Sequence, residues 1–290
     1  MKIATFRWQG ARHVGLVSAD GNSVEPFVLD AAQAERGALP LIEAQAAGKA
    51  LPAGSGRRLA LADVALEAPI PRPRRNIFCV GRNYHEHAKE LADSVFKPNK
   101  GDVASYPIVF SKVPECVIAP GDAIELPGAA VSEQIDYEAE ILVVIGRGGK
   151  NIPSSRALEH VWGYTIVNDV TARDVQMRHQ QWHLGKSFDT FCPMGPWLVD
   201  AAECDATATR IRCHVNGELR QQAHTRDLIF DIPTLIETIS RGITLYPGDL
   251  IATGTPAGVG LGFDPPRFLR AGDTVRIEVD GIGTLENPVR

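Results

Sequence analysis

The chain has 290 residues, of which 44% are hydrophobic and 22% are charged, proportions typical of a globular protein with a sizeable core. Its net charge of −5 and its scattered basic residues exclude the basic patch that nucleic acid or a membrane surface requires, so we expect neither as a partner. The first ten residues do not resemble a signal peptide, and the five cysteines include no Cys-x-x-Cys pair, so we expect a reduced, cytoplasmic protein.

The beginning of the chain is predicted to form a small α/β domain over residues 1–70. A segment rich in proline and arginine, residues 69–75, follows it. Because proline fixes the backbone and cannot donate to a sheet, we interpret this segment as the entry to a second, larger domain over residues 71–290. The elements predicted in the small domain are strands at residues 1–8 and 13–17 and a helix near residues 41–50.

The larger domain is predicted to contain many short strands and few helices. Because the strands do not alternate with helices, a doubly wound parallel sheet is disfavoured, and the predicted fold class is α+β, mostly β. The predicted strands cover residues 77–80, 108–111, 123–126, 135–145, 161–168, 197–199, 211–215, 249–253 and 274–279, and the predicted helices cover residues 83–92, 171–181 and 232–240.

Helical spacing suggests an acid–base pair early in the larger domain. If Asn83 caps the helix there, His87 and Glu90 are three residues apart and share one face. A carboxylate beside an imidazole orients the ring and raises its basicity, as a general base requires. The alternative, favoured by spacing alone, is an exposed ion pair in solvent.

The next informative segment carries two glutamates on a predicted strand. Side chains alternate along a strand, so Glu138 and Glu140 point to the same face, and the apolar run after them indicates burial. Two buried like charges repel each other and lose hydration, and a bound cation would resolve both problems. The alternative is an edge strand with two solvated glutamates.

A third carboxylate, Asp169, follows the strand predicted over residues 161–168. Its alternative role is to cap the helix that follows. Together with Glu138 and Glu140 it makes an all-oxygen ligand set, which suits Mg²⁺, Mn²⁺ or Ca²⁺ better than Zn²⁺. Three protein ligands would leave coordination positions open for water and a chelating substrate.

Two further segments are candidates for contacts to an anion. Lys186 lies among apolar residues and glycine, and near a metal it could stabilise an enolate; the neighbouring Gly-Lys-Ser string lacks the first glycine of a phosphate-binding loop. Residues 249–260 read as a strand that enters a Gly-rich loop. That loop either brings amides and Thr hydroxyls to an anionic ligand or is a tight turn.

In this order, the strings V-G-R-N-Y-x-x-H-x-x-E, D-Y-E-A-E, N-D-V-T-A-R-D-V-Q, G-K-S-F-D and T-G-T-P-A-G-V-G resemble the fumarylacetoacetate hydrolase superfamily over roughly residues 75–290. The resemblance implies a mixed β-roll core and usually a homodimer. It implies metal binding by Glu138, Glu140 and Asp169, a water-activating pair of His87 and Glu90 on a lid, and a catalytic Lys186. The resemblance also implies that five residues contact the substrate or the residues around it: Arg82, Tyr84, Arg173, Gln176 and Thr255.

One position departs from the founding members of the family. Where they carry a fourth metal ligand, an Asp, this chain has Val80, so it resembles the shorter branch that binds metal through three carboxylates. We therefore expect an enzyme that uses Mg²⁺ or Mn²⁺ to hydrolyse the carbon–carbon bond of a 2,4-dioxo acid to pyruvate and a carboxylic acid. Lid residues 96–105 would set the specificity for a small 2-oxo acid.

The same resemblance leaves other functions open. The chain could isomerise or hydrate a 2-hydroxymuconate-type dienoate from aromatic catabolism, or it could decarboxylate oxaloacetate, because both reactions need the same enolate chemistry. A metal-dependent binding protein is disfavoured because His87 and Glu90 are both present.

Overall fold

Glu140 and the apolar run that follows it lie on a central strand of the molecule, β10 (Ala139–Ile145), whose seven side chains are all buried. It pairs antiparallel with β11 (Val161–Asn168) on one side and with β16 (Leu250–Ala252) on the other. Ile141 and Val143 pack into one hydrophobic core, and Leu142 and Val144 pack into another. Burial on both faces explains why this strand is a continuous apolar run rather than an alternating one.

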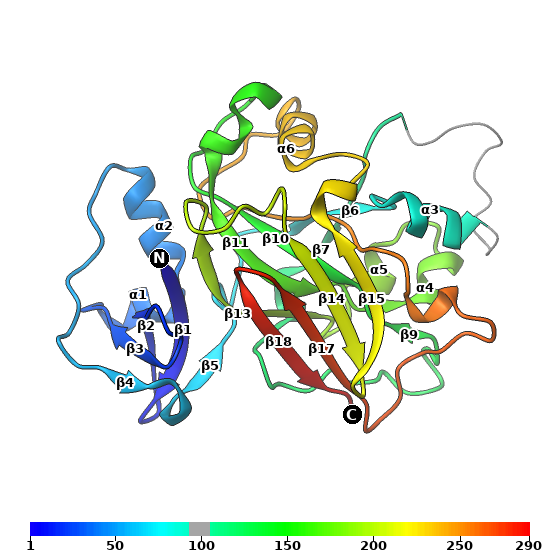
Figure 1. Ribbon diagram of the computed structural model, residues 1–290, viewed down its shortest axis with the longest axis horizontal. Helices are drawn as coiled ribbons and strands as arrows, with labels where there is room; N and C mark the ends of the chain where they lie inside the picture. Colours follow the sequence, from blue (N-terminus) through cyan, green and yellow to red (C-terminus); the bar gives the residue numbers. More distant parts are fainter. Residues whose placement is uncertain (93–104) are drawn as a thin grey trace.

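The computed structural model describes residues 1–92 and 105–290 (Figure 1). Its largest sheet runs in the order β4-β3-β2-β1-β13-β11-β10-β16-β6-β7, with β5 paired to β1 and β8 paired to β13. The remaining strands of this sheet are β1 (Lys2–Trp8), β2 (Ala11–Val17), β3 (Ser23–Pro26), β4 (Leu59–Ala60), β5 (Ala65–Glu67), β6 (Ile77–Gly81), β7 (Ile108–Lys112), β8 (Val117–Ile118) and β13 (Cys192–Asp200).

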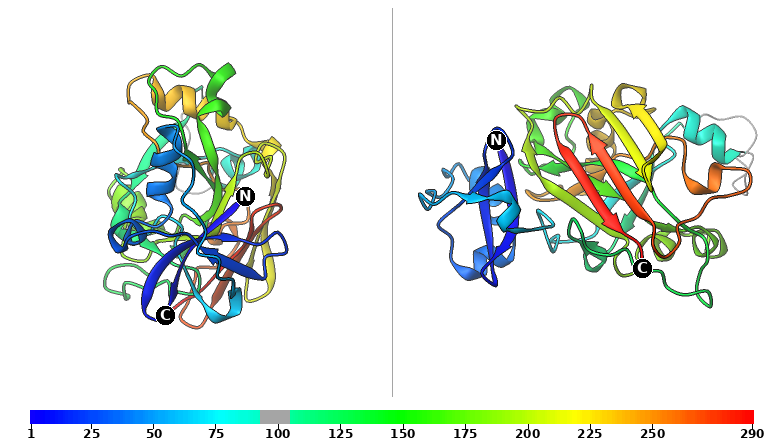
Figure 2. Two further views of the ribbon diagram at one scale, coloured as in Figure 1. Left: turned by 90° about the vertical axis from the view of Figure 1, so that its left-hand side faces the viewer. Right: turned by 60° about the horizontal axis from the view of Figure 1, so that its bottom comes forward.

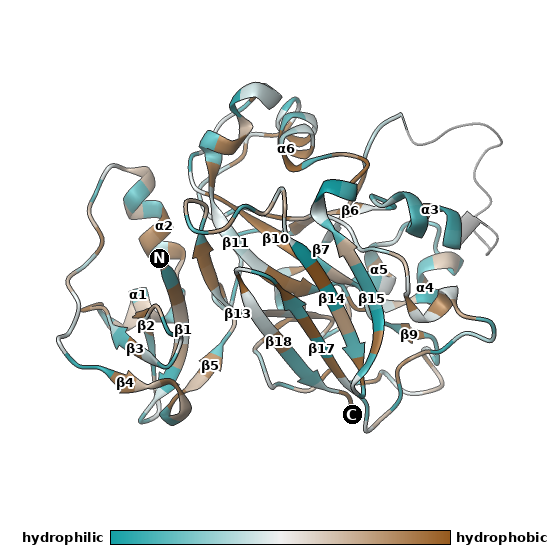
Figure 3. Cartoon of the chain, in the orientation of Figure 1, coloured by the Kyte–Doolittle hydropathy of each residue, from teal (hydrophilic) through white to brown (hydrophobic). Residues whose placement is uncertain are grey.

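A second, four-stranded sheet packs against one face of the largest sheet, so the larger part of the chain is a β-sandwich with few helices (Figures 1 and 2). Hydrophobic residues concentrate on the central strands, whereas helix α3 is hydrophilic (Figure 3). The expected α+β, mostly β fold is confirmed. The second sheet contains β15 (Glu218–His224), β14 (Arg210–Val215), β17 (Thr274–Val279) and β18 (Gly283–Pro288), and β9 (Ile135–Asp136) pairs separately with β12 (Thr171–Ala172).

The helices are short and lie at the edges of the sheets. Across the described residues, none is long and apolar enough to cross a membrane. They are α1 (Ala31–Glu35), α2 (Leu39–Ala46), α3 (His85–Ala92), α4 (Arg173–Arg178), α5 (His183–Lys186) and α6 (Ile232–Ser240), with the 3-10 turns η1 (Leu61–Asp63), η2 (Pro114–Cys116), η3 (Ser154–His160), η4 (Thr225–Asp227) and η5 (Gly260–Gly262).

The N-terminal strands gather at one side of the molecule (Figure 2). Strand β1 joins them to the rest because Lys2 and Ile3 pair with Val199 and Leu198 of β13. Helix α2 contributes its buried side chains to the same hydrophobic core as Leu142 of β10. The domain boundary at residue 70 stays a prediction.

Several elements differ from those expected. The strand predicted over residues 135–145 is interrupted between Asp136 and Ala139, because the Asp136 side chain accepts the backbone N–H of Tyr137 at 2.9 Å. Residues 123–126 contribute only an isolated bridge between Ile124 and Val289. Strands β15 and β18 were not predicted, because their sequences mix polar and charged residues with little apolar alternation.

The connection between β6 and α3 depends on Asn83. The helix begins at His85, and Asn83 does not cap it; its buried side chain instead crosses to two distant segments. Its Nδ2 donates to the carbonyls of Phe230 at 2.9 Å and Thr253 at 2.8 Å, and its Oδ1 accepts the N–H of Phe230 at 2.8 Å.

Replacing Asn83 with Ala should therefore reduce the free energy of unfolding by roughly 3 kcal/mol, because it leaves buried backbone groups without partners. Urea denaturation of the variant measures this loss. The matched control is Asn76→Ala, at an exposed asparagine whose φ is not positive, which should change stability by less than about 0.5 kcal/mol. Equal losses in the two variants would contradict the anchoring role.

Candidate active site

The structure brings the three predicted carboxylates together. Glu138 immediately precedes β10, Glu140 lies on that strand, and Asp169 follows β11, so the antiparallel pairing of Ala139 with Asn168 places them side by side. One oxygen of each lies within 4.8 Å of the others, and all three side chains are buried. The alternative of solvated glutamates on an edge strand is wrong.

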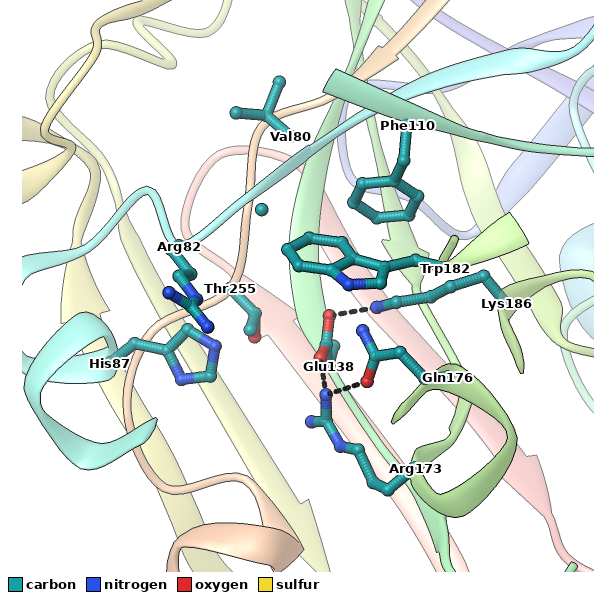
Figure 4. Close-up of a pocket in the computed structure, with 11 residues that line it drawn as sticks. Val80, Arg82, His87, Phe110, Glu138, Arg173, Gln176, Trp182, Lys186 and Thr255 are labelled. Carbon is teal, nitrogen blue, oxygen red and sulfur yellow. Dashed lines mark hydrogen bonds and ion pairs between the residues drawn. The ribbon is translucent and has the colours of Figure 1, made fainter. Parts of the chain in front are cut away.

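Three buried cations surround these carboxylates. Lys186 Nζ lies 2.7 Å from Glu138 Oε2 and 2.8 Å from Asp169 Oδ2. Arg173 Nη1 lies 2.7 Å from Glu138 Oε1, and Lys112 Nζ donates to Asp169 Oδ1 at 2.8 Å (Figure 4 shows Arg173 and Lys186 at Glu138). Buried charges are tolerated only when they are paired in this way.

The electrostatic environment treats the two glutamates differently. Burial opposes ionisation of Glu138, but Lys186 and Arg173 outweigh it and lower its pKa to about 2. Burial, then Asp169 and Glu138, raise the pKa of Glu140 well above its usual range. Glu140 therefore has the most to gain from a further cation, and the hard oxygen set fits Mg²⁺ or Mn²⁺.

Arg173 links this cluster to Asp136. Its Nε donates to Asp136 Oδ2 at 2.9 Å, and its Nη1 also reaches Gln176 Oε1 at 3.3 Å. Within the described part of the chain, Arg173 Nη2 is buried with no hydrogen-bond partner, although the residue lines the pocket. The arginine thus positions Glu138 and keeps one donor group for a ligand.

His87 and Glu90 form a pair on α3, in which His87 is buried and Glu90 is partly buried. His87 Nδ1 lies 3.0 Å from Glu90 Oε2, and His87 is only 3% exposed. The exposed pair of this helix is instead Lys89 with Glu86, at 2.8 Å. Because Nδ1 is engaged, Nε2 is the ring nitrogen that remains for chemistry.

One pocket is lined by His87, Glu138, Arg173 and Lys186. His87 and Lys186 approach it from opposite sides, with Glu138 between them (Figure 4). Phe110 and Trp182 make an aromatic wall, with ring centroids 5.3 Å apart, and Lys186 Nζ lies 5.0 Å from the Phe110 ring. The pocket is therefore charged at its base and apolar on one wall.

The other predicted substrate contacts divide between two cavities. Four of them line the same pocket, whereas Tyr84 lines a different cavity. Residues 96–104 of the expected lid lie outside the described residues, so their effect on specificity stays a prediction. The four residues in the pocket are Arg82, Arg173, Gln176 and Thr255.

The Gly-rich loop that follows β16 uses its amides within the protein. Gly254 N–H donates to Glu140 Oε2 at 2.7 Å, and Gly258 N–H donates to Glu90 Oε1 at 2.9 Å. Gly260 and Leu261 donate to the two oxygens of Asp136 at 2.6 and 3.0 Å. These amides thus hold the carboxylates of the site rather than an external anion.

Sequence reasoning missed Lys112 and Asp136 as parts of this site. Lys112 is fully buried at the end of β7, and its Nζ also donates to the carbonyls of Val170, at 3.1 Å, and Lys186. The available signal was a lysine that directly follows an apolar strand, in a position that usually carries a solvated residue. Such a lysine must be paired if the strand end is buried.

Comparisons with known proteins agree with this architecture. The family model of the fumarylacetoacetate (FAA) hydrolase C-terminal domain matches residues 76–290. Oxaloacetate tautomerase YisK of Bacillus subtilis is 50% identical over 230 residues, which cover 79% of this chain and 74% of that protein.

Two solved structures match over nearly their whole length. A fumarylacetoacetate hydrolase from Exiguobacterium antarcticum has a TM-score of 0.84 at 38% identity, covering 100% of this chain and 99% of that one. A 5-carboxymethyl-2-hydroxymuconate delta-isomerase from Mycobacterium smegmatis has a TM-score of 0.79 at 35% identity, with the same coverage. Fold and pocket together define an enzyme.

The chain belongs to the fumarylacetoacetate hydrolase superfamily, as its motifs predicted. The comparisons place isomerases and tautomerases as well as hydrolases among its relatives. Membership of this superfamily therefore establishes the fold and shows that the chain is an enzyme. The reaction that it catalyses has to be inferred from the chemistry of the pocket.

Lys112→Met tests the buried charge network. Removing this cation leaves Asp169 with one fewer partner in a buried site, and we expect a loss of about 3–5 kcal/mol in the free energy of unfolding. Urea denaturation measures the loss, with Lys89→Met as the control because Lys89 is 73% exposed. A Lys112 variant as stable as that control would contradict the network.

Proposed function

We propose that this chain is a metal-dependent enzyme that moves a proton on the carbon next to the carbonyl of a small 2-oxo acid, by keto–enol tautomerisation of oxaloacetate or a closely related isomerisation. The observation that carries the proposal is that buried His87, which is paired with Glu90, lines the same pocket as Lys186 and Glu138. The relatives named as a tautomerase and an isomerase favour proton transfer over the hydrolysis that the motifs first suggested.

Glu138, Glu140 and Asp169 would hold Mg²⁺ or Mn²⁺ in this enzyme. Their oxygens are close, hard and buried, as the site of such an ion requires. When bound, the ion supplies a Lewis acid for the carboxylate and 2-oxo oxygens of the substrate. Arg173 and Lys186 keep Glu138 ionised, and therefore able to bind the cation.

The residues of the chain then carry the proton. Glu90 accepts the Nδ1 hydrogen of His87, which leaves Nε2 free to take the proton from carbon 3 of the substrate. The electron pair of that C–H bond forms a double bond between carbons 2 and 3, and the π pair of the carbonyl moves onto the 2-oxo oxygen. The ammonium of Lys186 stabilises the enolate charge that develops there. His87 then returns the proton to the enolate oxygen and completes the tautomerisation.

The aromatic wall supports this assignment. Phe110 and Trp182 cover one side of the pocket, and Phe110 lies directly beside the ammonium of Lys186. Excluding water there strengthens the attraction between Lys186 and a developing enolate and protects the enolate from stray protonation.

As the resemblance implies, we also expect the enzyme to act as a homodimer, which sedimentation velocity would test.

Glu140→Gln tests the metal centre. We expect the unmutated protein, with Mn²⁺ or Mg²⁺, to speed the tautomerisation of oxaloacetate and the uptake of solvent deuterium at its carbon 3, both followed by NMR. Glu140→Gln should weaken Mn²⁺ binding by at least about tenfold in calorimetry and abolish this activity, because it removes a charged ligand.

The control for the metal centre is Glu86→Gln, at an exposed glutamate of α3 that should leave binding and activity unchanged. Full activity of Glu140→Gln in the presence of a chelator would refute the metal centre. Release of pyruvate from 2,4-dioxo acids without tautomerisation of oxaloacetate would instead establish the hydrolase.

His87→Asn tests the base. A positioned general base contributes on the order of 10²–10⁴ in rate, so kcat for deuterium uptake should fall by about 100-fold or more while Mn²⁺ affinity is unchanged. His85→Asn is the matched control, since His85 is exposed on the same helix and lies outside the pocket. Equal activity of the two variants would assign the proton transfer to another residue.

A further inference from the structure

The segment from Asp136 to Glu140 fastens the Gly-rich loop at several points. Asp136 accepts the amides of Gly260 and Leu261, and Glu140 accepts the amide of Gly254. These contacts fix the two ends of the loop, and Gly258 lies between them. The same segment thus carries metal ligands on one face and loop anchors along its length.

Gly258 is the point where this loop meets the acid–base pair. Its N–H donates to Glu90 Oε1 at 2.9 Å, and the other oxygen of Glu90 holds His87. Its φ of +100° favours glycine, and a Cβ there would lie 1.9 Å from the carbonyl oxygen of Arg220. Because no side chain can restrict this residue, external contacts must fix its backbone.

The carbonyl of Gly258 has such a contact. The hydroxyl of Tyr137 donates to it at 2.9 Å, and Tyr137 is fully buried directly before the metal ligand Glu138. The two peptide planes of Gly258 are therefore held on both sides, one by Glu90 and the other by Tyr137. Removing the hydroxyl would free the second plane and, through it, the amide that holds Glu90.

We propose that Tyr137 is a positioning residue for the base: its hydroxyl fixes the Gly258 peptide, which keeps Glu90 oriented toward His87. Tyr137 itself does not line the pocket, so it acts only through this chain of contacts. The alternative is a purely structural role, because Tyr137 also belongs to the main hydrophobic core. The catalytic part of the inference rests on the proposed function, whereas the positioning part does not.

The positioning part is tested by NMR on the full chain. Tyr137→Phe should speed hydrogen exchange of the Gly258 amide by roughly fivefold to tenfold, as expected for the loss of one hydrogen bond, and should shift the ¹⁵N signals of the His87 ring. Tyr164→Phe is the matched control, because Tyr164 is a buried tyrosine of the same core on β11. Exchange at Gly258 that is unchanged in Tyr137→Phe, or accelerated equally in the control, would overturn the proposal.

A double-mutant cycle tests the catalytic part. Tyr137→Phe should lower kcat for deuterium uptake by about fivefold with KM and Mn²⁺ affinity unchanged, and it should have no further effect in a Glu90→Ala background. If Tyr137→Phe lowered kcat by the same factor in the Glu90→Ala background as in the unmutated protein, Tyr137 would not act through Glu90, and the proposal would be refuted. An unmutated protein without turnover would refute the proposed function, and the exchange of the Gly258 amide would then decide the role of Tyr137.

Discussion

The burial of three carboxylates at one point between strands β10 and β11 is the constraint on which the rest of the site depends. Left unpaired, these groups would repel each other and lose their hydration, which no folded protein tolerates without compensation. Lys112, Lys186 and Arg173 come from three separate elements to balance them. Positioning these cations therefore requires α4, α5 and β7 to pack around the same strand ends.

A second consequence is that the carboxylate cluster and the His87–Glu90 pair share one support. The Gly-rich loop donates amides to Glu140, Glu90 and Asp136 in sequence order, so a single backbone segment holds one carboxylate of the cluster, the partner of His87 and the partner of Arg173. Backbone amides suit this role because they are rigid and cannot be lost by substitution of side chains. The geometry of the pocket is thus determined by main-chain contacts as much as by its own residues.

Proton transfer, decarboxylation and carbon–carbon hydrolysis of 2-oxo acids all pass through an enolate, which explains how one fold can carry enzymes with different names. What distinguishes them is whether the base acts on carbon or on a water molecule. In this chain buried His87 lines the same pocket as the aromatic residues Phe110 and Trp182, and the function proposed above has it act on carbon.

Local patterns in the sequence were sufficient to predict the mostly β fold, the shared face of Glu138 and Glu140, and the shared helix face of His87 and Glu90, because strand and helix periodicity act over a few residues. They could not predict Lys112 at Asp169, Asn83 at Phe230 and Thr253, or Tyr137 at Gly258, since these partners are 57 to 170 residues apart in the chain. Such contacts follow only from the order of strands in the sheet, where β10 lies between β11 and β16. Whether a charged residue is solvated or belongs to the site was therefore decided by the tertiary structure, because burial and pairing are properties of the packed chain.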